Sequence, residues 1–317
     1  MSLNMHNLLT HVQHPKSPKG YQAEEDSDAI RVSEYWGKKT NQIQSPKISF
    51  EFFPPRSDTA KKSLKETHLK LSSINPEHYS VTFGALGTSQ DATFDTIVNL
   101  SKDTEIPITP HLTCVDTNKK QVTELIDKYI SHGVNQVMVL KGDTPSKPLH
   151  KGDFEYANEM VKFIKEHYDN IDILVAAYPE KHPHSMNIRT DIDFFVDKVN
   201  SGATQAITQY FYNIDAYFHY IDELQKRNID IPITPGIMPI TNYEQLINFS
   251  KTCGAEIPAW ILNRLKLYRH DPESLKEFGQ DVVSEMCLNL KENGVNSFHF
   301  YSMNKAEPVL SISKILI

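Results

Sequence analysis

Short apolar or β-branched runs alternate with segments of helical spacing along most of this 317-residue chain. Residues 118–133 carry apolar side chains on one helical stripe, residues 190–202 repeat the pattern, and each segment ends in glycine. A strand followed by a helix, about eight times within one domain's length, predicts a (β/α)8 TIM barrel. The expected strands are 48–53, 78–83, 106–111, 136–140, 172–177, 206–211, 231–235 and 297–301.

The connections between these runs refine the prediction. A doubly wound open sheet, the competing fold, would more often show a glycine-rich turn after its first strand, whereas residues 54–58 read Pro-Pro-Arg-Ser-Asp. Before the last strand, the spacing predicts an extra helix around 257–269, and Thr241 with Glu244 has capping-box spacing. We expect a single barrel domain over residues 47–317, preceded by a polar arm over 1–46 that includes one short amphipathic helix.

Composition narrows the classes of function. A formal net charge of -7 and a pI of about 6.1 argue against a general nucleic-acid binder, which needs a basic face. The three cysteines form no C-x-x-C pair, and the polar, His-rich N-terminus has no apolar stretch for a signal peptide or membrane helix. We therefore expect a cytoplasmic protein without a membrane segment. His182 and His184 lack a Cys or carboxylate partner at ligand spacing, so no metal is expected.

The first expected strand, in "ISFEFFPPR", contains one carboxylate between two phenylalanines. Successive side chains of a strand point to opposite faces, so Glu51 faces away from Phe50 and Phe52. If the phenylalanines meet the outer helices, Glu51 points into the barrel. A salt-bridge partner is the alternative interpretation of this residue.

Unlike polar side chains stand at the same end of several expected strands. In such barrels the active site lies at the C-terminal ends of the strands. Polar groups gathered there are costly unless other polar groups, water or a ligand satisfy them, so the pattern predicts a site for a large polar ligand. The candidates are Glu51, Thr82, His111, Asp143, Gln209, Tyr301 and Lys305.

Long motifs in this chain resemble those of methylenetetrahydrofolate reductases. They are "SFEFFPPR", "YSVTFGA", "TPHLTC", "LKGD", "VAAYPEKHP", "GATQAITQYFY", "PGIMPI", "IPAW" and "FHFYSMNKAE", in the family's order from about residue 47 to the C-terminus. The likeness is to the short bacterial members, which are FAD-containing (β/α)8 barrels. It implies reduction of 5,10-methylenetetrahydrofolate to 5-methyltetrahydrofolate, a reaction that feeds methionine synthesis. NADH or NADPH would pass a hydride to FAD and leave, and the folate would then take the hydride in the same place.

The resemblance assigns roles to individual residues. Glu51 matches the general acid that protonates folate N10, and burial would raise its pKa toward neutrality. Asp143 matches an aspartate near both flavin and folate, where its charge would tune both half-reactions. Gln209 matches a residue that touches nicotinamide and folate, and Thr82 one near the nicotinamide. Tyr301 and Lys305 are expected on the folate side. The positions that match FAD contacts are Phe83, Ala85, His111, Lys141, Gly142, Asp143, Ala157, Tyr178, His182, Ser185, Asp191 and Lys198.

Several positions depart from the family's pattern. Lys141 and Lys305 stand where well-known bacterial members have Arg, which keeps the charge but loses the bidentate fork. Phe83 stands where a Tyr is common in the family. Asp197 stands where a basic residue is frequent, and Phe194 where an Asn can occur. These changes affect individual cofactor contacts rather than the chemistry.

Two other functions remain open on the sequence alone. One is another flavin-linked barrel oxidoreductase, such as a proline dehydrogenase relative, against which the specific motifs argue. The other is a catalytically inactive folate- or flavin-binding barrel protein, against which the joint presence of Glu51, Asp143 and Gln209 argues. The resemblance also implies a homo-oligomer, a tetramer or a dimer.

Overall fold

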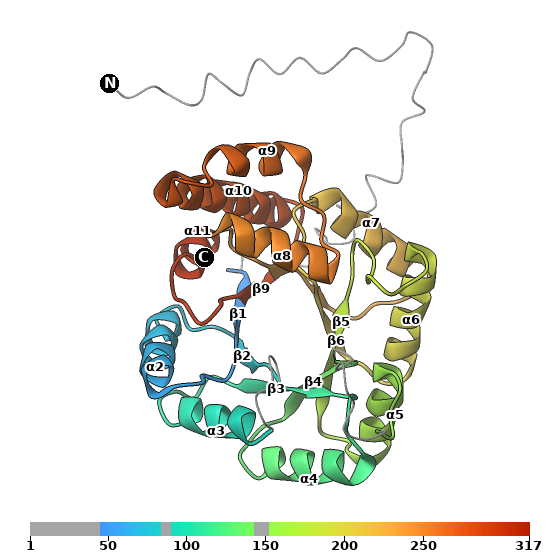
Figure 1. Cartoon of the computed structure of the whole chain (residues 1–317). Helices are drawn as coiled ribbons and strands as arrows, with labels where there is room; N and C mark the ends of the chain where they lie inside the picture. The colour runs from blue at the N-terminus through green and yellow to red at the C-terminus, as the bar shows by residue number, and fades with distance from the viewer. Residues whose placement is uncertain (1–44, 84–89, 143–151) are drawn as a thin grey trace, which may run out of the picture. The chain divides into compact units, whose positions relative to one another are not determined.

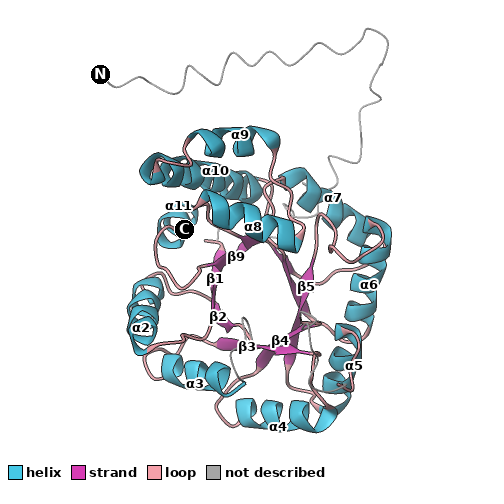
Figure 2. Cartoon of the chain, in the orientation of Figure 1, coloured by secondary structure: helices cyan, strands magenta, loops and turns pink. Residues whose placement is uncertain are grey.

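The computed structural model describes residues 45–83, 90–142 and 152–317. Nine parallel strands form one sheet in the order β7-β6-β5-β4-β3-β2-β1-β9-β8, and helices cover its outer face (Figures 1 and 2). The strands are β1 Lys47–Phe52, β2 His78–Val81, β3 Ile108–Thr113, β4 Gln136–Leu140, β5 Asp172–Ala177, β6 Gln205–Thr208, β7 Ile233–Thr234, β8 Gly236–Ile237 and β9 Ser297–Tyr301. The helices are α2 Asp58–Ser72, α3 Gln90–Ser101, α4 Lys119–Ile130, α5 Ala157–His167, α6 Ile188–Asn200, α7 Ile214–Gln225, α8 Tyr243–Cys253, α9 Ala259–Leu267, α10 Pro272–Glu292 and α11 Val309–Leu316.

The predicted TIM barrel is confirmed, with one difference in its seventh strand. Within the expected run 231–235 only β7 is a strand, and a second short piece, β8, follows beyond Pro235. β7 pairs with β6 while β8 pairs with β9, so this broken strand closes the barrel. Proline has no backbone N–H and interrupts the ladder. The Pro235 carbonyl still accepts a hydrogen bond from the His299 N–H at 3.0 Å.

Helix α4 follows its predicted stripe except at one end. The Asn118 side chain accepts a hydrogen bond from the Gln121 N–H, and the Gln121 side-chain oxygen accepts one from the Asn118 N–H, which makes a capping box. Val122, Leu125, Ile126 and Tyr129 are buried, but Ile130 is 44% exposed. At 3.6 residues per turn, Ile130 lies about 80° from the centre of the stripe, so it reaches the solvent edge.

The N-cap of α8, the helix that precedes the extra helix, lies one residue after the expected position. The prediction of a capping box at Thr241 and Glu244 is wrong: Asn242 caps α8 and accepts a hydrogen bond from the Gln245 N–H at 2.8 Å. Asn is a stronger N-cap residue than Thr, which accounts for the shift. The extra helix expected around 257–269 is confirmed as α9 and is followed by the long helix α10.

The side chains of β1 divide as the alternation requires. Phe50 and Phe52 are fully buried on the outer face of the strand, where the Phe52 ring lies 5.1 Å from Tyr79 and 6.3 Å from His68 of α2, between ring centroids. Glu51 points to the opposite side, toward His111 of β3. The inward orientation predicted for Glu51 is therefore confirmed.

The barrel interior has two unlike walls. On the wall made by β9, β1 and β2, the His299 ring contacts the hydroxyls of Ser49 and Ser80, with Nδ1–Oγ and Nε2–Oγ distances of 2.7 and 3.4 Å. On the wall made by β4, β5 and β6, Met138, Leu174 and Ile207 form one buried apolar cluster. We call these the polar wall and the apolar wall.

Within the described residues, none of the helices is both long and apolar enough to cross a membrane.

Candidate active site

Glu51 is the ionisable group at the centre of the site. In the parallel ladder it stands between Ser80 of β2 and Tyr301 of β9, and its side chain is 22% exposed. Burial raises the pKa of Glu51 to about 8, because the carboxylate form loses its hydration. Glu51 therefore carries a proton at neutral pH.

Among the described residues, the basic group nearest to Glu51 is an imidazole that stays neutral. His111 Nε2 lies 3.7 Å from Glu51 Oε2, and the His111 side chain is 4% exposed. Burial, with His78 nearby, lowers the pKa of His111 to about 3. The contact joins an uncharged acid to an uncharged imidazole, so the alternative interpretation of Glu51 as a salt-bridge partner does not hold at neutral pH.

Other residues predicted at the strand ends stand at the same end of the barrel as Glu51. The Thr82 N–H donates to the Phe52 carbonyl at 3.0 Å, which ties the end of β2 to β1. The Gln209 N–H donates to the Ala177 carbonyl at 2.8 Å, and its side-chain Oε1 accepts from the next backbone N–H at 3.0 Å. Both residues are partly exposed, although the Thr82 Oγ1 atom itself is buried.

Tyr301 crosses the broken seventh strand. Its hydroxyl donates to the Thr208 carbonyl at 2.7 Å, over Gly236. A Cβ on Gly236 would stand 2.1 Å from that carbonyl oxygen and 2.7 Å from the Tyr301 ring. Only glycine allows this approach. Tyr301 thus joins β9 to β6 beside Glu51.

The segment after β5 gathers five of the residues predicted to bind the cofactor. Asp191 accepts hydrogen bonds from the Ser185 hydroxyl at 2.5 Å and from the His182 N–H at 3.1 Å. The Tyr178 and His182 rings meet edge to face at 4.7 Å. Lys198 donates to the Ala176 carbonyl, and burial lowers its pKa to about 8 although Asp191 opposes the shift. Sequence positions 20 residues apart therefore form one polar cluster.

The predicted cofactor-binding positions after β4 form a second group. Lys141 is exposed, and its Nζ stands 4.6 Å above the Tyr156 ring, next to Ala157 at the first position of α5. Gly142 has a φ of +82°, and a Cβ there would stand 2.9 Å from Thr113 Cβ. Gly142 is therefore required both by its backbone conformation and by its close neighbour.

Not every predicted site residue joins this arrangement. Asp143 and Ala85 lie outside the described residues. Phe83 is partly buried at the end of β2. Lys305 is exposed in the turn after β9, where its N–H donates to the Ser302 carbonyl at 2.9 Å.

The sequence prediction missed two groups of buried titratable residues. His78 and His299 lie inside the barrel with ring centroids 5.9 Å apart. The signal for His299 was available, since Phe298-His299-Phe300 repeats the pattern around Glu51. Glu180, after β5, accepts from the Glu256 N–H at 2.8 Å, and burial raises its pKa to about 7. No periodicity marks Glu180, because it lies in a loop.

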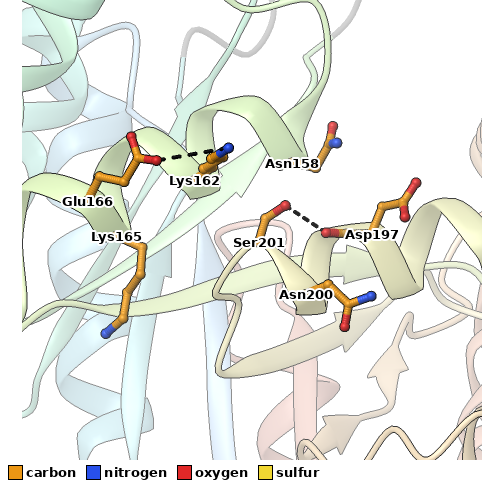
Figure 3. A pocket seen from close by; sticks show the side chains of 7 residues that line it. All are labelled: Asn158, Lys162, Lys165, Glu166, Asp197, Asn200 and Ser201. Carbon is orange, nitrogen blue, oxygen red and sulfur yellow. Dashed lines mark hydrogen bonds and ion pairs between the residues drawn. The ribbon is translucent and has the colours of Figure 1, made fainter.

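A separate groove lies between α5 and α6, on the outer layer of the barrel (Figure 3). It has a volume of about 610 Å³ and is lined by Asn158, Lys162, Lys165, Glu166, Asp197, Asn200 and Ser201. The lining pairs opposite charges, as in Lys162 with Glu166 at 4.0 Å, and contains none of the predicted site residues. Across the described ranges, no group of three or more His, Cys, Asp or Glu side chains is arranged to hold a metal ion.

Known proteins resemble this chain over most of its length. A family model described as methylenetetrahydrofolate reductase matches residues 38–316. A protein named 5,10-methylenetetrahydrofolate reductase from Buchnera aphidicola subsp. Schizaphis graminum (strain Sg) is 39% identical over 265 residues, 83% of this chain and 89% of that protein. The protein of the same name from Escherichia coli (strain K12) is 35% identical over 269 residues, 85% of this chain and 90% of its own.

A solved structure agrees with the barrel. An uncharacterized protein from Clostridium thermocellum that binds two copies of 5-methyl-5,6,7,8-tetrahydrofolic acid superposes with a TM-score of 0.63, covering 86% of this chain and 95% of its own. At 18% identity this likeness supports the fold alone. The match to the family model over nearly the whole described barrel carries the assignment: this chain belongs to the methylenetetrahydrofolate reductase family.

Proposed function

We propose that this protein is an oxidoreductase that reduces 5,10-methylenetetrahydrofolate to 5-methyltetrahydrofolate, with FAD as cofactor and NADH or NADPH as hydride donor. Family membership supports the reaction class. The observation that carries the mechanism is Glu51, a carboxyl group at the barrel interior whose pKa burial raises to about 8. A general acid works best when its pKa lies near the operating pH.

Glu51 would supply the proton that opens the methylene bridge. The bridge joins N5 and N10 of the folate, and its N10–CH₂ bond breaks when N10 receives a proton. The Glu51 O–H bond breaks, an N10–H bond forms, and a carboxylate remains at Glu51. The cation formed at N5 can then accept a hydride. An acid that ionised well below neutral pH would have no proton to give.

The surrounding residues would favour this role by lacking strong positive charge. Among the described residues, one basic side-chain nitrogen lies within 4.0 Å of the Glu51 carboxyl group, namely His111 Nε2. Burial keeps that imidazole neutral. A cation at this distance would stabilise the carboxylate and lower the pKa of Glu51. Gln209 and Tyr301 flank the same end of the barrel and are proposed to orient the folate.

The residues at the barrel rim fit a large polar cofactor. Thr82 Oγ1, just after β2, is buried without a hydrogen-bond partner in the described chain, so it is suited to meet a bound group. The backbone at Gly142 leaves no room for a side chain. Bound FAD would carry hydride from the nicotinamide to the folate. The residues proposed to hold it are Lys141, Gly142, Tyr178, His182, Ser185, Asp191 and Lys198, together with Asp143 and Ala85.

The decisive experiment separates the two half-reactions in one anaerobic cuvette. The purified protein should have a flavin absorption spectrum that bleaches when NADH or NADPH is added and recovers when methylenetetrahydrofolate follows. A protein that stays colourless after FAD is added would favour the inactive binding-barrel alternative. A flavin that bleaches but never recovers with folate would contradict the proposed substrate.

Glu51→Gln tests the acid directly. Glutamine keeps the size of the side chain but has no proton to give, so reoxidation by the folate should fall about 10²–10⁴-fold. Bleaching by nicotinamide requires no proton from this residue and should persist. Equal loss of both steps would contradict the role of Glu51. Glu166→Gln, in the groove between α5 and α6, is the matched control for removing a carboxylate.

A further inference from the structure

His111 Nε2 is a buried polar atom with no hydrogen-bond partner in the described part of the chain. Its side chain is 4% exposed, and the polar atom it approaches is Glu51 Oε2, at 3.7 Å. A buried nitrogen without a partner is costly, so such an atom calls for an explanation. Its place beside the acid suggests one.

The groups around this pair define its electrostatics. Tyr301 of β9 stands beside Glu51 in the ladder, and its pKa is raised far above the usual range by burial and by Glu51. His78 of β2 and His299 of β9 face His111 from the polar wall, and burial lowers both pKa values. Met138 of β4 adjoins His111 on the other side. At neutral pH every one of these groups is uncharged.

Two hydrogen bonds are possible once the gap closes by a small rotation of either side chain. If His111 Nε2 accepts the Glu51 proton, that proton points away from the folate. If Nε2 carries a hydrogen and donates to Oε2, the Glu51 proton stays on the other oxygen and remains available. After the proton leaves, the same N–H meets a carboxylate, and a hydrogen bond to a charged acceptor is about twice as strong.

We propose that His111 is a positioning residue for Glu51: its Nε2–H donates to Glu51 Oε2, holds the acid in place and stabilises the carboxylate formed when the proton is delivered. This inference rests on the proposed function for its use in turnover, but not for the contact itself. It differs from the cofactor contact that the family resemblance implies for His111. The carboxylate regains its proton from solvent after the product leaves.

The sign of one pKa shift tests the proposal. The full-length protein is labelled with ¹³C-glutamate and titrated by infrared spectroscopy without folate or nicotinamide, with whatever cofactor it retains. The Glu51 carboxyl band is identified by its absence in Glu51→Gln. In His111→Phe the donor to the carboxylate is gone, so the pKa of Glu51 should rise by about one to two units.

Each other outcome overturns the proposal. A fall in the pKa of Glu51 would mean that His111 accepts the proton, and an unchanged pKa would mean that the two groups do not interact. His111→Gln, whose amide can donate from a similar position, should restore most of the wild-type value. If His111→Phe does not fold, the pKa of Glu51 is compared between His111→Gln and His111→Leu instead. A Gln variant with the same pKa as the Leu variant would then overturn it.

The matched control is His78→Phe. His78 is also a buried neutral imidazole whose Nε2 lacks a partner in the described chain. It stands beside Ser49, one inward position below Glu51, so the same substitution there should leave the pKa of Glu51 unchanged. The readout needs no turnover. Failure of the proposed reaction with an intact pKa response would therefore be distinguishable from failure of this inference.

Discussion

The polar wall and the apolar wall of the barrel solve the same packing problem with different chemistry. On β4 to β6, Met138, Leu174 and Ile207 fill the interior with apolar contacts alone. On β9, β1 and β2, His299, Ser49 and Ser80 fill it with rings and hydroxyls that satisfy one another. Both walls exclude water, but only the polar wall can change its protonation state.

The apolar wall contributes to stability, whereas the polar wall holds the groups that can change their protonation state. Burying an imidazole costs free energy unless it stays neutral, and burial lowers the pKa of His78 to about 4. The same desolvation raises the pKa of Glu51. The apolar wall and the outer layer of Phe50 and Phe52 offset these costs. We expect substitutions on the two walls to have effects of different kinds.

The largest effect should come from the apolar wall. Leu174 is 1% exposed, so Leu174→Ala should lower the free energy of unfolding by about 2–5 kcal/mol through lost contacts and a cavity. Ser80→Ala on the polar wall is the matched comparison. It removes only a long 3.4 Å contact and should cost less than about 1 kcal/mol. Denaturant unfolding measures both, and equal costs would contradict the division between the walls.

The next effect is a pH dependence that belongs to the polar wall. The pKa of His78 is lowered from 6.5 to about 4, so the folded state prefers the neutral ring. Its contribution is complete above pH 6.5 and is lost as pH falls toward 4, by about 3 kcal/mol. His78→Phe should remove this part of the acid sensitivity, as measured by unfolding at several pH values.

The pH dependence of stability expected from Glu51 has the opposite sign to that expected from His78, so the two can be told apart. The raised pKa of Glu51 means that the folded state prefers the protonated acid, so its contribution to stability is complete below pH 4.5 and is lost as pH rises from there to about 8. In His78→Phe only the acid side of the stability curve should flatten. A variant that flattens the alkaline side instead would contradict the assignment of His78.

The smallest effect tests the seam between the walls. Tyr301→Phe removes the hydroxyl that donates to the Thr208 carbonyl at 2.7 Å, which should cost about 1–2 kcal/mol. The ring stays over Gly236, so the fold should be kept. Tyr212→Phe, whose hydroxyl donates to the Met238 carbonyl at 3.2 Å, is a matched control away from Glu51. A much larger loss for Tyr301→Phe would mean that this hydroxyl also orders the site.

Much of the fold followed from local patterns, and the misses have local causes. Of the five buried positions that the stripe of α4 predicted, four are buried, and the prediction failed at Ile130 because that residue lies at the edge of the stripe. The run at 231–235 predicted the seventh strand, but a proline broke its ladder into β7 and β8. The cap at Asn242 was missed by one residue, since Thr241 and Glu244 also have capping-box spacing.

The candidate site divides along a similar line. Strand alternation was enough to turn Glu51 inward, and the rule for strand ends was enough to group it with Thr82, His111, Gln209 and Tyr301 on one end of the barrel. These are period-two and connectivity arguments, which need no knowledge of distant neighbours. The roles in folate chemistry came from motif resemblance, not from these arguments.

Protonation states and close approaches depended on packing between strands that are far apart in the chain. Glu51 and His111 are 60 residues apart, and their facing atoms meet only when β1 and β3 close around a common interior. Gly236 gives no hint in the sequence that the Tyr301 hydroxyl will pass over it to Thr208. Periodicity along one strand sets the direction of a side chain, whereas its pKa depends on the water removed by all the others.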